Sequence, residues 1–341
     1  MISRIIKKYK LPSVGYALLK DGNLTDIYVE GVRKISTSTR VTPNDKYHIG
    51  SCTKAMTATL VAIFIKDGLL SWKTKLKALF PYVHPDYEST TIEMLLAHRG
   101  GISNDLINFI DGKLWNIIKD KTLDPVEGRK ILCLEMLTRK PFAAPGSKFI
   151  YSNAGYTILG AILETISNSS WENLLKQKLF KPLKMNSSGF GSPANPDLLK
   201  KPNQPWGHNF LEDVLTPCNV DNPPTIGPAG SVHCTIGDWL KFIKLHLDGS
   251  NEKSNFFEPD IFFKLHKPYP KQKYTYGGWI RLNRSWADGM VLTHAGSNNY
   301  NHAKVLIAPV KNSAILIFMN YGGQKKKAIS DEIIRYLVKQ I

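Results

Sequence analysis

The stretch that most constrains the fold of this 341-residue chain is the run from Thr53 to Ile65, which contains neither Gly nor Pro. Its residues are small or apolar around most of a helical projection, so we predict a helix that is buried on most of its sides. Such a helix must be covered by other parts of the chain. The chain is long enough for a sizeable core, in one large domain or two.

A possible nucleophile precedes this helix in the sequence Gly50-Ser51-Cys52-Thr53-Lys54. We predict Ser51 at the helix cap or first position, with Lys54 stacked beside its hydroxyl one turn later. The helix dipole and the apolar surroundings both disfavour a charged lysine, and a neutral lysine is able to take the serine proton. The plain alternative is a capping serine with an incidental lysine. A second S-x-x-K, at Ser250, lies in a polar stretch that reads as a solvated loop.

Strand patterns occur at both ends of the chain, with helical patterns between them. Runs rich in β-branched and aromatic residues predict strands, and amphipathic runs predict a helix at each terminus. The strands are expected at residues 13–19, 24–32, 274–282, 290–294, 302–308 and 314–320, and the terminal helices at 1–10 and 328–341. We therefore predict an α+β fold, in which an antiparallel sheet is flanked by terminal helices and a mainly helical domain is inserted.

The expected domain boundaries follow from this order of elements. Residues 1–50 and 272–341 would form a discontinuous sheet domain, and residues 51–271 a mainly helical domain, with the active site between the two. Within the helical part, residues 186–230 are rich in Pro, Asn and Gly, and we predict long loops over a surface or cleft there.

Two further motifs carry possible chemistry. Tyr151 and Asn153 form the only Y-x-N of the chain, just before a predicted helix, where Tyr151 could relay a proton and Asn153 could orient Lys54. His294 and Gly296 form an H-x-G at the end of a predicted strand, where glycine allows close approach to the strand edge. Taken singly, each motif has an ordinary structural alternative, namely a packed tyrosine beside a capping asparagine and a strand histidine before a turn.

The three motifs in this order resemble the serine β-lactamase and penicillin-binding superfamily. The likeness is to its class C branch, which includes D,D-carboxypeptidases, D-aminopeptidases and esterases. It runs from about residue 11 to near the C-terminus. Further matching stretches are Leu95-Leu96-Ala97-His98, Pro145-Gly146, Pro228-Ala229-Gly230 and Thr235-Ile236-Gly237-Asp238. The resemblance implies a β-lactamase/transpeptidase-like fold.

The resemblance also implies roles for individual residues. Ser51 would be the acylated nucleophile, Lys54 and Tyr151 would share general-base work, and Tyr151 would protonate the leaving group. The backbone N–H groups of Ser51 and Ser297 would form the oxyanion hole. No metal or organic cofactor would be needed. The residues expected to contact the substrate are Asn153, His294, Gly296 and Ser297.

The third motif departs from the K-T-G that many β-lactamases carry. Here it reads His294-Ala295-Gly296, so the hydroxyl that threonine would offer is absent. We therefore expect a serine hydrolase acting on esters or on peptides with D-residues. One alternative is a D,D-carboxypeptidase or a class C-type β-lactamase. Another is a non-catalytic penicillin-binding-like protein that keeps the fold.

Composition narrows the partners and the compartment. The formal charge of +17 comes from basic residues spread along the chain, which is typical of a solvated surface and could also favour anionic cell-wall polymers. We expect a small-molecule or peptide substrate, for which the cell wall is one source. We expect no nucleic-acid partner, because no basic motif is interleaved with aromatics. No apolar run reaches about 18 residues, so we expect no transmembrane segment. The first ten residues do not read as a secretory signal; a removed leader would make the protein periplasmic or secreted.

Overall fold

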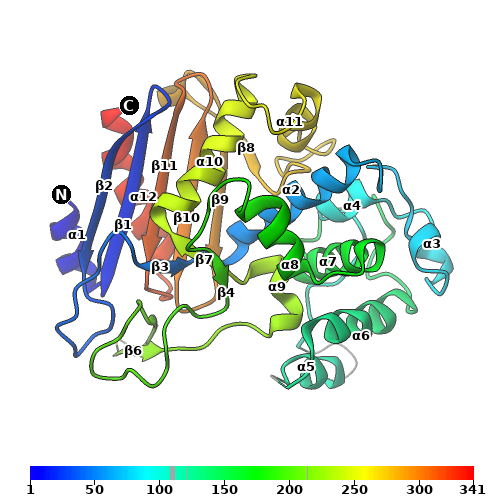
Figure 1. Ribbon diagram of the computed structural model, residues 1–341, viewed down its shortest axis with the longest axis horizontal. Helices are drawn as coiled ribbons and strands as arrows, with labels where there is room; N and C mark the ends of the chain where they lie inside the picture. The colour runs from blue at the N-terminus through cyan, green and yellow to red at the C-terminus, as the bar shows by residue number, and fades with distance from the viewer. Residues whose placement is uncertain (108–111, 121, 213) are drawn as a thin grey trace.

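The first and last strands of the chain lie side by side in one six-stranded antiparallel sheet, in the order β2-β1-β11-β10-β9-β8 (Figure 1). Strand β1 (Ser13–Lys20) pairs with β11 (Ser313–Met319). The prediction that both chain ends build one antiparallel sheet is therefore confirmed. The structure is a computed structural model that describes residues 1–107, 112–120, 122–212 and 214–341.

The other elements complete this sheet and the helical part beside it. The remaining strands are β2 (Asn23–Gly31), β3 (Lys46–His48), β4 (Gly189–Phe190), β5 (Gly207–Leu211), β6 (Val214–Cys218), β7 (Val232–Thr235), β8 (Ile280–Arg284), β9 (Gly289–Ser297) and β10 (His302–Ala308). The α-helices are α1 (Ile2–Tyr9), α2 (Thr53–Lys66), α3 (Leu76–Leu79), α4 (Ile92–Leu96), α5 (Lys113–Ile118), α6 (Pro125–Leu137), α7 (Asn153–Ser167), α8 (Trp171–Leu175), α9 (Gly227–Gly230), α10 (Ile236–Ser250), α11 (Pro259–His266) and α12 (Lys326–Leu337). Two 3-10 turns matter for the site, η1 (Gly50–Cys52) and η4 (Pro224–Ile226).

The sheet is buried on both faces because its strands alternate between two apolar clusters. Val14, Tyr16 and Leu18 of β1 pack with the terminal helices α1 and α12. Ala17 and Leu19 point the other way, into the main core that α10 also joins. In Figure 1 the two terminal helices lie behind the sheet at the left, and α10 crosses in front of it. The terminal helices therefore flank the sheet as predicted.

Helix α2 is the centre of the main core, as its apolar sequence predicts. Its first twelve residues, Thr53 to Phe64, are all buried. The expected position of Ser51, at the cap or first position of this helix, is wrong in detail, because Ser51 lies in the 3-10 turn η1 and Cys52 takes the cap position. The physical reason is the left-handed backbone of Gly50, with φ of 51°, which a right-handed α-helix cannot include, so the chain enters α2 through the turn η1.

Two local expectations differ from the structure. Residues 186–230 do not consist of loops alone, since they contain β4, the antiparallel hairpin β5–β6, η4 and α9. The strand expected at 274–282 begins only at Ile280, because Gly277 and Gly278 interrupt the preceding stretch, with Gly278 at φ of 76°. The two-domain division stays a prediction, and α10, inside residues 51–271, packs on strands of the sheet as well as on helix α11.

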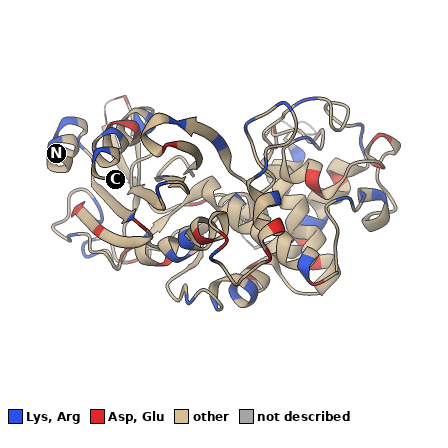
Figure 2. Ribbon diagram, turned by 90° about the horizontal axis from the view of Figure 1, so that it is seen from above, with Lys and Arg blue, Asp and Glu red and all other residues tan. Residues whose placement is uncertain are grey.

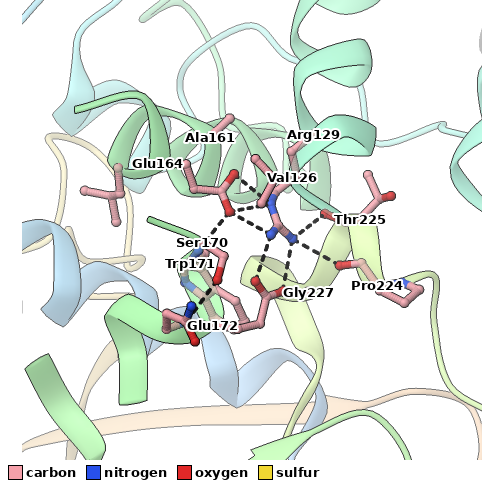
Figure 3. Close-up of polar contacts among 12 residues, drawn as sticks. Val126, Arg129, Ala161, Glu164, Ser170, Trp171, Glu172, Pro224, Thr225 and Gly227 are labelled. Carbon is pink, nitrogen blue, oxygen red and sulfur yellow. Dashed lines mark hydrogen bonds and ion pairs between the residues drawn. The ribbon is translucent and has the colours of Figure 1, made fainter. Parts of the chain in front are cut away.

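A buried arginine joins four segments of the helical part (Figure 3). Arg129 on α6 forms ion pairs with Glu164 on α7, at 2.7 Å, and with Glu172 on α8, at 2.8 Å. It also donates hydrogen bonds to the carbonyl oxygens of Pro224 and Thr225 in η4. The guanidinium is fully buried, so its pairing with two carboxylates offsets a desolvation cost of several kcal/mol. This network fixes the segment that leads into α9.

Charge is distributed over the whole molecule. Figure 2 shows Lys and Arg on both the sheet part and the helical part, without concentration on one element. In the part of the chain that the structure describes, no helix combines the length and apolarity needed to cross a bilayer.

Candidate active site

The turn that carries Ser51 is pressed against the end of strand β9. A side-chain carbon on Gly50 would lie 2.3 Å from the Ser297 amide nitrogen, and one on Gly296 would lie 2.7 Å from the Ser51 amide nitrogen. Real contacts at these distances do not occur, so both positions require glycine. The structure thus brings the first and third motifs into backbone contact, and Gly296 and Ser297 lie beside Ser51.

The amine of Lys54 makes three close contacts inside the core. Its Nζ donates hydrogen bonds to Asn153 Oδ1 and to the Ala229 carbonyl oxygen, both at 2.7 Å, and lies 3.3 Å from Ser51 Oγ. A neutral amine has two N–H bonds and one lone pair. The first two contacts use the N–H bonds, so the lone pair remains for the Ser51 hydroxyl. The first and second motifs therefore meet at Lys54, and Asn153 makes the contact with Lys54 that the sequence analysis expects.

The surroundings of Lys54 favour the neutral amine. The side chain is fully buried, and burial lowers its pKa to about 7. Among the described residues no carboxylate forms an ion pair with it. At neutral pH a large share of the molecules therefore holds Lys54 without its proton, which is the state a general base needs.

Tyr151 lies between Lys54 and an aromatic cluster. The Lys54 nitrogen is 4.8 Å from the centre of its ring. Burial raises the pKa of the Tyr151 phenol, and a hydrogen bond with the Ser51 hydroxyl opposes that rise only in part. The resting phenol is therefore protonated. Ser152 caps α7 by accepting a hydrogen bond from the Gly155 N–H, which holds Asn153 at the first position of the helix.

Two aromatic residues of this cluster have no role in the motif analysis. His98 lies with its ring 4.4 Å from that of Tyr151, and its Nδ1 accepts a hydrogen bond from the Ser152 N–H. Tyr274 contacts the rings of both His98 and Tyr151. His98 stands in one of the stretches that carry the family resemblance, which was its only signal. Tyr274 had none, since a tyrosine at the start of an expected strand is ordinary.

His294 is buried behind the strand edge. Only 4% of the residue is exposed, and its Nε2 lies 3.4 Å from the Tyr274 hydroxyl. Burial lowers the pKa of the imidazole to about 3, so it is uncharged at neutral pH. The neighbouring Ala295 is exposed on the other face of β9. The third motif therefore places no permanent cation at this strand position.

Comparison with known proteins agrees with the arrangement of the three motifs. The sequence profile of the Beta-lactamase family matches residues 1–339. The chain belongs to the Beta-lactamase family. Penicillin-binding protein 4 of Amycolatopsis lactamdurans is 28% identical to this family member over 251 residues, covering 71% of this chain and 61% of that protein. The chain spans about three fifths of the length of the curated relatives it matches.

Solved structures of other proteins share the fold of this Beta-lactamase family member. The octameric penicillin-binding protein homologue from Pyrococcus abyssi superposes with a TM-score of 0.80 at 22% identity, over 99% of this chain and 76% of that chain. The D-amino acid amidase from Ochrobactrum anthropi SV3 superposes with a TM-score of 0.77 at 17% identity, over 99% of this chain and 98% of that one. The predicted family and fold are confirmed, whereas the roles of individual residues stay predictions.

Proposed function

We propose that this protein is a serine hydrolase that forms an acyl-enzyme on Ser51 with small neutral esters or D-residue peptides. The observation that carries the proposal is the buried amine of Lys54. Its Nζ donates to Asn153 Oδ1 and to the Ala229 carbonyl oxygen and lies 3.3 Å from Ser51 Oγ, so that in the neutral amine the lone pair is left for the Ser51 hydroxyl. A lysine with a purely structural role, in packing or in an ion pair, needs neither a lowered pKa nor a serine hydroxyl beside its amine.

The proposed acylation begins when the Ser51 oxygen attacks the substrate carbonyl carbon and gives its proton to Lys54. The carbonyl π electrons move onto the oxygen, which the N–H groups of Ser51 and Ser297 would stabilise. The bond to the leaving group then breaks, and Tyr151 protonates that group because its phenol is protonated at rest. Lys54 returns its proton to Tyr151, so both groups are reset.

Deacylation repeats the general-base step with water in place of the Ser51 hydroxyl. Lys54 takes a proton from water as the water oxygen attacks the acyl carbonyl carbon. The tetrahedral intermediate expels the Ser51 oxygen, which takes the proton back from Lys54, and the free acid leaves. The protein gains and loses no proton over the cycle. Acylation and deacylation both begin with the neutral amine of Lys54.

Substrate preference follows from the third motif. His294 is neutral and buried, and Ala295 offers no hydroxyl, so this strand lacks the charge-assisted partner that a β-lactam carboxylate would use. Such a contact is worth about 1.5–3 kcal/mol. A neutral ester does not need that contact. The proposal therefore ranks esters above β-lactams.

The experiment is covalent labelling with a fluorescent phosphonate, followed by peptide mapping. The wild-type protein should be labelled on Ser51, and Ser51→Ala should neither be labelled nor turn over a p-nitrophenyl ester. Ser250→Ala is a matched control, because Ser250 belongs to the second S-x-x-K and lies at the end of α10. It should keep wild-type labelling. Labelling of Ser51→Ala at another residue would refute the proposal.

A further inference from the structure

Three side chains from separate segments form a hydrogen-bonded line that begins at the turn carrying Ser51. His48 ends strand β3, Asp221 lies in the loop between β6 and η4, and Asn298 directly follows β9. His48 Nε2 is 2.8 Å from Asp221 Oδ2, and Asn298 Nδ2 donates to Asp221 Oδ1 at 3.0 Å. The His48 side chain is fully buried and that of Asp221 is 8% exposed. None of the three belongs to the motifs or to the proposed catalytic set.

The direction of each hydrogen bond in this line follows from its neighbours. The Gly50 N–H donates to His48 Nδ1 at 3.0 Å, so the histidine proton must be on Nε2 and points at Asp221. Asn298 Oδ1 accepts from the N–H groups of Tyr300 and Asn301, so its NH₂ group also points at Asp221. Asp221 therefore accepts on both carboxylate oxygens, which an asparagine or a leucine in its place cannot do.

This buried carboxylate is held by neutral donors alone. Within the described ranges no Lys or Arg forms an ion pair with Asp221. Burying a carboxylate without a cation is costly, even with good hydrogen bonds. The arrangement is therefore a poor device for stability. Its two ends instead reach the two backbone segments on which the proposed chemistry depends.

We propose that Asp221 is a positioning residue that sets the spacing of the oxyanion hole. Through His48 it holds Gly50, the residue before Ser51. It also holds Asn298, the residue after Ser297, directly. The two N–H groups of the hole belong to Ser51 and Ser297. One carboxylate thus links the turn η1 to the end of β9. These two backbone segments must stay at a constant separation while charge develops on the substrate oxygen. This inference rests on the proposed function.

The test exchanges the two hydrogen-bonding partners. Asp221→Asn turns an NH₂ group toward the NH₂ group of Asn298, and Asn298→Asp sets two carboxylates against each other. The double variant Asp221→Asn/Asn298→Asp restores every hydrogen bond with the donor reversed, and it keeps the total charge. We expect each single variant to lower kcat for a p-nitrophenyl ester by roughly 10–100-fold at little change in KM, the usual size for a supporting residue. The double variant should recover most of the loss.

Rates are expressed per site titrated with the fluorescent phosphonate, so that unfolded protein does not count. The ratio of kcat for an ester to kcat for the matching thionoester gives a second readout, because sulfur accepts hydrogen bonds poorly and gains less from the hole. This ratio should fall in the single variants and return in the exchanged pair. Unchanged kcat per titrated site, or an unchanged ratio with lower thermal stability, would overturn the positioning role. Absence of any label on Ser51 in the wild type would instead refute the proposed function itself.

Discussion

Lys54 should make the stability of the protein depend on pH in a way that a Lys54→Met variant does not. Burial lowers the pKa of the folded-state amine from 10.5 to about 7. Between these two values the unfolded chain holds the extra proton, so the free energy of unfolding rises with pH by up to about 1.4 kcal/mol per pH unit. Over the whole window the rise attributable to Lys54 is at most about 5 kcal/mol, and below pH 7 it is absent.

Methionine fills a similar volume without a titratable group. It leaves Asn153 Oδ1 and the Ala229 carbonyl without their donor, which costs roughly 1–3 kcal/mol for each acceptor. That cost is the same at every pH in this window. The slope of stability against pH therefore isolates the buried amine, whatever the constant offset between the two proteins.

The assay is urea unfolding followed by the fluorescence of the seven tryptophans, at pH 6.5, 8 and 9.5. The other titrating groups are shared by both proteins. The free energy of unfolding of the wild type should therefore rise relative to that of Lys54→Met as pH increases. Lys253→Met, which removes the exposed lysine of the second S-x-x-K, is the control and should keep the wild-type pH dependence. Parallel curves for wild type and Lys54→Met would refute the reasoning that Lys54 is neutral in the folded protein.

Further outcomes are expected at other positions. The kcat/KM for a neutral ester should fall below about pH 7, as Lys54 becomes protonated, and pH-rate profiles would show a limb elsewhere if another group were the base. Tyr151→Phe should lower kcat by about 10²–10⁴, measured by stopped-flow acylation, whereas an unchanged rate would exclude it as the acid. Arg129→Ala should lower the free energy of unfolding by about 3–5 kcal/mol in urea, because Glu164 and Glu172 lose their partner; a loss below 1 kcal/mol would contradict this. A p-nitrophenyl short-chain ester should give a higher kcat/KM than a chromogenic cephalosporin at the same pH and salt, and the opposite order would favour the β-lactamase alternative.

Local patterns were enough to predict the elements that repeat with a regular period. Consecutive residues show the burial pattern of helix α2, which is apolar, and of strands β1, β10 and β11. The sheet built from both chain ends could therefore be predicted. The spacing of Ser51 and Lys54 worked for the same reason, since it is a property of one turn. The sequence did not predict the type of turn that carries Ser51. The left-handed backbone of Gly50 packs against the end of strand β9, which lies far along the chain.

The sequence by itself thus determined the family, the sheet and the identity of the residues that meet at Ser51. The sequence also predicted that a charge on Lys54 is disfavoured, but only the tertiary structure decided how far its pKa falls and which groups its amine contacts. The pKa of Lys54 depends on how completely the core covers it, and its second acceptor is the Ala229 carbonyl, a backbone group that every residue possesses. The line joins His48 to Asp221 across 173 residues of sequence and Asp221 to Asn298 across a further 77, so no local period marks it. Contacts of that kind exist only once the chain has packed.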